Sequence, residues 1–231
     1  LLVIGGYNAY LAAHELVTER DRYPAFNIPI ICVPASIDNN LPGSELSIGA
    51  DTALNNAIGA LDSIKQSAAA SHRCFVAESM GRKCGYLALM SGIATGAERV
   101  YLNEDGLTLA QLAKDSARMV ESFRSGRQLY LVIRNERASE NYTLDVLAKI
   151  FAQEGRGLYD VRHAALGHLQ QGGDPSAFDR IMATKLVAHA LDLLADQLGA
   201  GTHHSSYVGL TGGRITHRRL ERMNDELDLS S

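Results

Sequence analysis

Three short segments of this chain hold the residues whose types and spacing suit chemistry on a ligand. Pro34–Asn40 reads P-A-S-I-D-N-N, Arg73–Tyr86 reads R-C-F-V-A-E-S-M-G-R-K-C-G-Y, and Arg162–Gly173 reads R-H-A-A-L-G-H-L-Q-Q-G-G. Together they supply a carboxylate, arginines, a histidine and glycine turns. Guanidinium groups bind phosphate dianions through paired hydrogen bonds, and a carboxylate can accept the proton of a sugar hydroxyl. The three segments therefore predict a site for a phosphorylated sugar.

Asp38 is the candidate general base. It follows an apolar strand, and open α/β sheets bind their ligands beyond the carboxyl ends of their strands. Ser36 would place a hydroxyl near the same sugar oxygen. The alternative is that Asp38 only caps a turn, because Asx turns are common in such loops.

Arg73 and Arg162 each begin an apolar strand, and either could bind a phosphate or form a local ion pair at the surface. Gly81 would let the backbone approach a ligand where a strand turns into a helix, whose first N–H groups attract anions. Met80 beside it either contacts the ligand or fills the core.

Composition excludes several classes of function. The chain has 231 residues, is 46% apolar and carries a net charge of −4, so no broad positive field predicts binding to nucleic acid. No apolar run approaches the roughly 20 residues of a membrane span, and we expect no membrane partner. Cys32, Cys74 and Cys84 lack metal-type spacing, which favours buried thiols in a reducing, cytoplasmic compartment. The first residues read as a buried strand, so we expect a preceding segment.

Strands alternate with helices along the chain, which predicts a doubly wound α/β fold. The strands are expected at Leu2–Ile4, Ile28–Val33, Arg73–Ala77, Val100–Leu102, Leu129–Ile133, Val161–Leu166 and Val208–Leu210. The helices are expected at about 9–22, 52–69 with Asp51 as N-cap, 81–94, 109–125, 143–154 and 179–198. The charged tail after Thr216 is expected to be helical. His203 and His204 lie in a Gly/Ser-rich tract, which is either a flexible turn or a metal site.

The expected domains are two Rossmann-like lobes with a sugar-phosphate cleft between them. The first lobe would combine residues 1–50 with about 170–205, and its N-terminal part would be missing. The second lobe would combine about 51–169 with 206–231.

Five sequence words, in one order, carry a family resemblance. They are S-I-D-N-N, S-I-G-A-D-T-A-L-N, M-G-R-K-C-G-Y, G-H-L-Q-Q-G-G and P-S-A-F-D-R, which begin at Ser36, Ser47, Met80, Gly167 and Pro175. With them the chain resembles the phosphofructokinase family from Val3 to about Leu198. The words G-G-Y-N-A-Y, I-K-Q-S-A, R-N-E and S-E-N-Y-T make it most similar to the effector-binding C-terminal half of the tandem eukaryotic-type enzymes.

The resemblance implies roles for single residues of this chain. It places Met80 against the sugar, Arg82 near the transferred phosphate, His168 on the 6-phosphate, and Asp38 as base. Glu136 follows the expected strand Leu129–Ile133, where its carboxylate either binds two sugar hydroxyls or pairs with a neighbouring arginine, Arg134 or Arg137, at the surface. It implies that Arg73 and Arg162 reach a neighbouring subunit's phosphate, so that the protein would be a dimer or tetramer. Gln171 stands where many catalytic members have an arginine, which implies a phosphate-binding site with less positive charge.

The nucleotide position departs from the family pattern. Catalytic members have G-G-D-x-S there, whereas this chain has Gly6, Tyr7, Asn8 and Ala9. Mg²⁺ prefers hard oxygen ligands, and phosphoryl transfer depends on the metal to neutralise developing charge. The resemblance thus implies Mg-ATP for the parent 6-phosphofructokinase and no cofactor for this segment, although pyrophosphate stays open as the donor.

Three hypotheses follow for this segment. The first is that this segment is an effector-type half, which binds a fructose phosphate, of an enzyme that catalyses a step of glycolysis. The second is a catalytic kinase half that uses Asp38 and Arg82. The third is an oligomerisation scaffold with a vestigial pocket. Tyr7, Asn40 and Gln171 favour the first, and the retained Asp38 and Arg82 favour the second.

Overall fold

The computed structural model describes residues 1–68 and 72–223, which form two compact units. One unit comprises Leu1–Asp51 with Pro175–Ser231, and the other comprises Thr52–Asp174. Each unit has its own sheet and its own core, so each is described separately.

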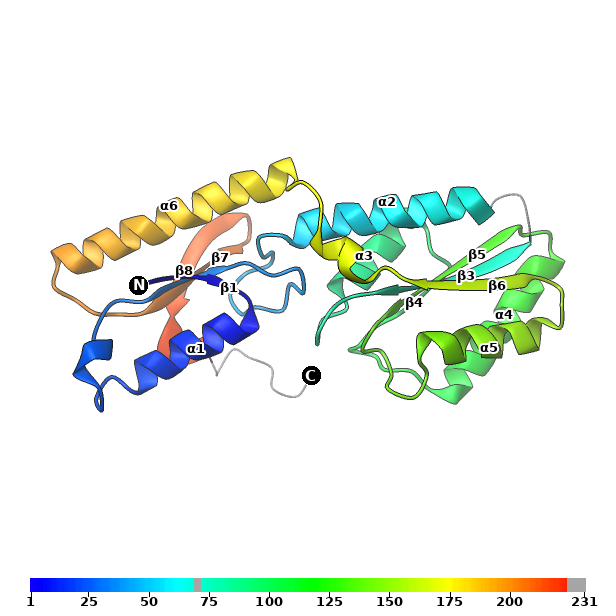
Figure 1. Cartoon of the computed structure of the whole chain (residues 1–231), viewed down its shortest axis with the longest axis horizontal. Helices are drawn as coiled ribbons and strands as arrows, with labels where there is room; N and C mark the ends of the chain where they lie inside the picture. The colour runs from blue at the N-terminus through cyan, green and yellow to red at the C-terminus, as the bar shows by residue number, and fades with distance from the viewer. Residues whose placement is uncertain (69–71, 224–231) are drawn as a thin grey trace. The chain divides into compact units, whose positions relative to one another are not determined.

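The first unit is a four-stranded sheet covered on both faces. Its strands are β1 (Leu2–Gly5), β2 (Ile31–Pro34), β7 (Ser206–Thr211) and β8 (Arg214–Arg219), in the order β1-β2-β7-β8. The first three are parallel, and β8 runs antiparallel to β7. Helix α1 (Tyr7–Thr18) lies on one face and α6 (Ala177–Gly199) on the other, as Figure 1 shows. Short 3₁₀ turns occupy Pro24–Phe26 and Leu220–Arg222.

The second unit has a fully parallel sheet in the order β4-β5-β3-β6. These strands span Arg99–Tyr101 (β4), Leu129–Asn135 (β5), Arg73–Ser79 (β3) and Asp160–Ala165 (β6). Helices α2 (Ala50–Ala68) and α3 (Tyr86–Thr95) cover one face, whereas α4 (Leu109–Arg124) and α5 (Leu144–Gly155) cover the other (Figure 1). A 3₁₀ turn, η2 (Gly167–Gln171), follows β6.

Local sequence explains why these elements form. Every residue of β2 is buried, as expected for a parallel strand packed on both faces. Helices α4 and α6 begin at side-chain caps, because Thr108 and Ser176 accept hydrogen bonds from the N–H groups three residues later. Gly96 ends α3 in the left-handed conformation that glycine adopts without strain.

Three expectations about these elements are wrong. Helix α3 begins at Tyr86 rather than Gly81, and α2 begins at Ala50, so Asp51 lies in its first turn instead of capping it. The charged tail after Thr216 begins with the last residues of strand β8 and not with a helix; the short 3₁₀ turn Leu220–Arg222 follows, and the residues after Met223 lie outside the described residues.

Residues 206–223 belong to the first unit, whereas they were expected in the second lobe. The reason is that β7 pairs with β2 in parallel and then turns back as β8. Among the described helices, none is long and apolar enough to cross a membrane.

Candidate functional site

The carboxyl ends of β3 and β5 bring two predicted ligand residues together in the second unit. Ser79 and Asn135 are register partners at these ends, and the Glu136 N–H donates to the Ser79 carbonyl at 2.9 Å. The Gly81 N–H in turn donates to Glu136 Oε1 at 3.2 Å. The carboxylate of Glu136 is therefore held beside the backbone of Met80 and Gly81.

Gln170 connects this turn to the segment that carries His168. Its side chain is 1% exposed, its Oε1 accepts the Met80 N–H at 2.8 Å, and its Nε2 donates to Ser79 Oγ at 3.1 Å. Because Gln170 lies in η2, these bonds fix η2 against the end of β3. His168 and Gln171 of the same turn are exposed, as a ligand contact requires. Sequence reasoning missed Gln170, whose polar side chain is buried between two exposed neighbours.

Only glycine fits at position 81, because the backbone of Cys84 lies too close for a side chain there. Its φ is +149°, and a Cβ there would lie 2.4 Å from the Cys84 carbonyl oxygen. Asn135 Nδ2 donates to the carbonyl oxygens of Gly81 and Cys84, at 3.1 and 3.2 Å. Residues 81–85 thus form an ordered loop, from which Arg82 is exposed.

The expected anion site at the start of α3 is not formed as predicted. The helix begins five residues after Gly81, and the N–H of its N-cap residue Gly85 donates to Glu104 Oε1 at 2.7 Å. The N–H of Gly81 is bonded to a carboxylate as well. Both backbone donors therefore bind protein carboxylates in this structure.

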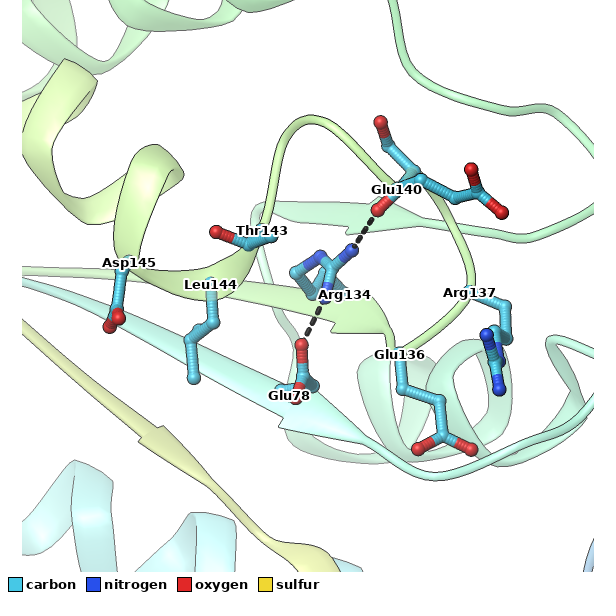
Figure 2. A pocket seen from close by; sticks show the side chains of 9 residues that line it. Glu78, Arg134, Glu136, Arg137, Glu140, Thr143, Leu144 and Asp145 are labelled. Carbon is cyan, nitrogen blue, oxygen red and sulfur yellow. Dashed lines mark hydrogen bonds and ion pairs between the residues drawn. The ribbon is translucent and has the colours of Figure 1, made fainter.

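A pocket of about 410 Å³ opens beside Glu136, between the end of β5 and the start of α5. Buried Arg134 bonds to Glu78 and donates to the Ser139 carbonyl at 2.9 Å, whereas Glu136 extends away from it (Figure 2). The pocket is lined by Glu78, Arg134, Glu136, Arg137, Ser139, Glu140, Thr143, Leu144 and Asp145. Its surplus of carboxylates suits hydroxyl donors and disfavours a phosphate.

Arg73 and Arg162 lie away from this edge. Arg73 is the first residue of β3, and Arg162 lies two residues after the start of β6. Asp160 Oδ2 is 3.8 Å from Arg73 Nε and 2.9 Å from Arg162 Nε. Six residues of strand separate Arg73 from Ser79, or roughly 20 Å. The two arginines therefore share a carboxylate with each other and do not line the Glu136 pocket of their own chain.

In the first unit, the two motifs after β1 and β2 lie side by side. The Ala35 N–H donates to the Gly5 carbonyl at 3.0 Å, and a Cβ on Gly6 would lie 3.5 Å from Ser36 Oγ. Ser36 Oγ accepts the Asp38 N–H at 3.2 Å, which orders the loop that carries the candidate base. Ser36 and Asp38 are both half-buried.

The start of α1 offers no carboxylate to a metal. Tyr7 packs against a core cluster that includes Tyr10 and Val17, and Asn8 is exposed. Ala9 lies close to Gly5, where a Cβ would approach the Ala9 Cβ to 2.6 Å. No acidic residue occupies the first turn of this helix. The residues at this position therefore do not fit Mg²⁺ with a nucleotide.

Two polar residues missed by sequence reasoning fix the loop after β2. Asn39, with φ +52°, donates from Nδ2 to the Glu45 carbonyl at 2.9 Å and accepts the Ser47 N–H at 2.8 Å. Asp179, which is 2% exposed, accepts the Gly49 N–H at 2.9 Å. Residues in the segments S-I-G-A-D and P-S-A-F-D-R therefore make the hydrogen bonds that hold this loop in place.

The three cysteines form no disulfide, and burial differs among them. Cys32 and Cys74 are buried and Cys84 is half-buried. Burial raises the pKa of the Cys32 thiol to about 12, and it also raises the pKa of Cys74. Both stay protonated at ordinary pH. Within residues 1–68 and 72–223, no three His, Cys, Asp or Glu side chains group as metal ligands.

Comparison with known proteins decides the family. The model of the family described as phosphofructokinase matches residues 1–194 of the chain. The chain belongs to the phosphofructokinase family. This confirms the resemblance inferred from the five sequence words.

Curated relatives of this phosphofructokinase chain cover almost all of it. The ATP-dependent 6-phosphofructokinase of Dictyostelium discoideum is 44% identical over 98% of the chain, which spans 28% of that relative. The platelet-type enzyme of Oryctolagus cuniculus is 45% identical over 99% of the chain, which spans 30% of it. The chain thus spans less than a third of the curated relatives it matches.

Solved structures show the same fold. The phosphofructokinase of Saccharomyces cerevisiae matches 98% of the chain with a TM-score of 0.93 and 34% identity. The phosphofructokinase of Pichia pastoris in the T-state matches 97% with a TM-score of 0.90. The chain covers 32% and 28% of these two proteins. The α/β fold predicted from the sequence is confirmed.

Proposed function

We propose that this chain is the fructose-phosphate-binding part of an ATP-dependent 6-phosphofructokinase. The parent enzyme would phosphorylate fructose 6-phosphate to fructose 1,6-bisphosphate in the cytoplasm, as a step of glycolysis. The names of the relatives support the activity. One observation carries the ligand class: Glu136 is held 3.2 Å from the Gly81 N–H, beside Met80 and the turn that bears His168.

Each side chain of this edge has a distinct part in binding the ligand. The Glu136 carboxylate accepts hydrogen bonds from sugar hydroxyls, and Met80 packs against the ring. His168 donates to the 6-phosphate. The phosphate lies outside the pocket beside Glu136, because the carboxylates of that pocket would repel it. Gln170 makes no contact with ligand in this account and instead positions Met80 and η2.

Arg73 and Arg162 serve the site of a second copy of the chain. Arg73 lies roughly 20 Å from the carboxyl end of β3, and Arg162, the register partner of Phe75, lies roughly 13 Å before that end, which supports this part of the proposal. Asp160 holds both guanidinium groups near each other, so they can present a paired cationic surface to a neighbour's phosphate. Ligand binding then requires a dimer or tetramer.

The segment is an effector-type half rather than a catalytic one. Tyr7, which is half-buried against the core, stands where a catalytic half would offer a carboxylate, and no acidic residue lies in the first turn of α1. The segment therefore binds no Mg-ATP, which belongs to the rest of the parent enzyme. The fructose phosphate bound here changes the activity of a site elsewhere in the protein.

A catalytic half is the second candidate. The observation that favours it is the ordered turn in which Ser36 Oγ accepts the Asp38 N–H, next to Gly6. This turn would hold Asp38 in place to act as a general base. Arg82 is exposed in the loop after β3, as the catalytic reading also requires.

Equilibrium binding to the full-length protein tests the proposed ligand class. Calorimetry with fructose 6-phosphate and fructose 1,6-bisphosphate should show binding at this half that Glu136→Gln and His168→Ala each weaken roughly 10- to 100-fold, because each removes a charged or phosphate-directed hydrogen bond. Glu154→Gln, a change of the same type on the exposed side of α5, is the matched control. Unchanged affinity in both site variants contradicts the proposal.

A further inference from the structure

Two histidines of the first unit meet on the face of the sheet that α6 covers. His189 of α6 and His217 of β8 approach with 3.4 Å between His189 Nε2 and His217 Nδ1. The centroids of their rings are 5.6 Å apart. His189 is half-buried and His217 is exposed, so solvent ions reach the pair.

Packing beneath the pair fixes the positions of both backbones. Ile215 packs against a core cluster that contains Leu186 and Ala190 of α6. Side chains alternate along a strand, so His217 lies on the same face of β8 as Ile215. His217 is the register partner of the buried Val208, which ties it to the centre of the hairpin. The meeting of the two imidazoles is thus a consequence of the fold.

The separation of the two nitrogens matches the edge of a metal coordination sphere. Zinc binds histidine nitrogen at about 2.0–2.1 Å, so two nitrogens of a tetrahedral site lie about 3.3–3.4 Å apart. Imidazole suits Zn²⁺, Cu²⁺ and Ni²⁺, whereas Mg²⁺ and Ca²⁺ prefer oxygen ligands. We propose that His189 and His217 chelate a late transition-metal ion that joins α6 to the β7–β8 hairpin.

Chelation requires one tautomer of each ring. In the metal-free pair, one imidazole donates its N–H to the other. In the chelate, His189 Nε2 and His217 Nδ1 both offer lone pairs, and the protons lie on His189 Nδ1 and His217 Nε2. The proton between the rings moves to an outer nitrogen through water. Two neutral imidazoles therefore bind the ion without net release of a proton.

The site has two protein ligands and completes its coordination with water. Within the part of the chain that the structure describes, no third His, Cys, Asp or Glu joins the pair. It is therefore an exchangeable site, in contrast to a structural zinc site with four protein ligands. Affinity for divalent ions is expected to peak at Cu²⁺, in the order common to nitrogen ligands.

The histidine pair lies far along α6 from the loop after β2 that carries Asp38. Asp179, which holds the loop after β2 through Gly49, precedes His189 by ten residues of one helix, or roughly 15 Å. The ion instead links two segments of the first unit whose histidines are 28 residues apart in sequence. Its expected effect is to raise the melting temperature of that unit.

Titration of the full-length protein with CuCl₂ and ZnCl₂ tests the site. Calorimetry should show a site that His189→Gln and His217→Gln each weaken at least tenfold, with MgCl₂ giving no such difference. The matched control is the double variant His203→Gln/His204→Gln, which removes the other histidine pair in this unit. Circular dichroism checks that each variant is folded.

Two outcomes overturn the proposal. One is unchanged Cu²⁺ and Zn²⁺ affinity in folded His189→Gln and His217→Gln proteins. The other is loss of the site in the His203/His204 double variant alone. Electron paramagnetic resonance of one equivalent of Cu²⁺ gives an independent readout, because the proposal predicts that the difference between wild type and either variant is one imidazole nitrogen. An identical nitrogen pattern in wild type and variants contradicts it.

Discussion

Replacing Gln170 by Leu should loosen the turn that holds Met80 and Gly81. The change removes two hydrogen bonds, from the Met80 N–H to Gln170 Oε1 at 2.8 Å and from Gln170 Nε2 to Ser79 Oγ at 3.1 Å. Each contributes about 0.5–1.5 kcal/mol, so about 1–3 kcal/mol of local stability is lost. Local opening of the turn becomes roughly 5- to 150-fold more frequent.

Hydrogen exchange of the peptide that contains Met80 measures this opening directly. We expect its backbone amides to exchange faster in Gln170→Leu by that factor, and the affinity for fructose phosphate to fall with it. Gln171→Leu is the matched control for exchange, because Gln171 is exposed in the same 3₁₀ turn. Equal exchange in Gln170→Leu and wild type would refute the role assigned to Gln170.

Three further predictions concern the nucleotide, the subunits and pH. Calorimetry of the 231-residue chain should detect no binding of Mg-ATP, and micromolar affinity would overturn our interpretation of Tyr7. Arg162→Ala and His168→Ala should each weaken fructose-phosphate binding, and mixed oligomers of the two should recover part of it; no recovery despite subunit exchange contradicts a shared site. Burial raises the pKa of the Cys32 thiol to about 12, and it also raises the pKa of the Tyr10 hydroxyl. Both groups therefore stabilise the folded state only while they are protonated. Stability should therefore fall as the pH rises above about 9, and an equal urea midpoint at about pH 8 and pH 10.5 would contradict this.

Most elements of the fold could be predicted because apolar runs mark them. The strands at 73–79 and 129–135 and the helix at 109–124 lie within a few residues of their expected places. Strand β8 was missed because half of its sequence, R-I-T-H-R-R, is arginine. Gly212 and Gly213, with φ of +58° and +73°, form the two-residue turn of a hairpin, and that dipeptide was the overlooked signal.

The candidate site could be predicted only for residues that would touch a ligand. Glu136 and Gly81 were chosen for their chemistry, and the structure brings them together. Gln170, Asn135 and Asp179 were missed because each bonds to the backbone of a segment remote in sequence. Such pairings depend on tertiary structure, and residue type alone does not reveal them.

The placement of Arg73 and Arg162 shows a different limit of sequence reasoning. Their position at the start of strands was visible, but their shared partner Asp160 was not, because the pairing of β3 with β6 brings Asp160 opposite Arg73. The local ion pair and the phosphate contact were weighed as alternatives. The structure contains the ion pair, and the contact with a neighbour's phosphate stays a prediction.

Asp38→Asn in the full-length protein tests the effector-type assignment most directly. We predict that the maximal turnover rate, at saturating substrate and effector, stays at the wild-type value. The concentration of fructose phosphate needed for activation should change, since a negative charge near a phosphate is removed. If Asp38 is instead a catalytic base, turnover should fall by about 10²–10⁴-fold, and such a loss would contradict the account.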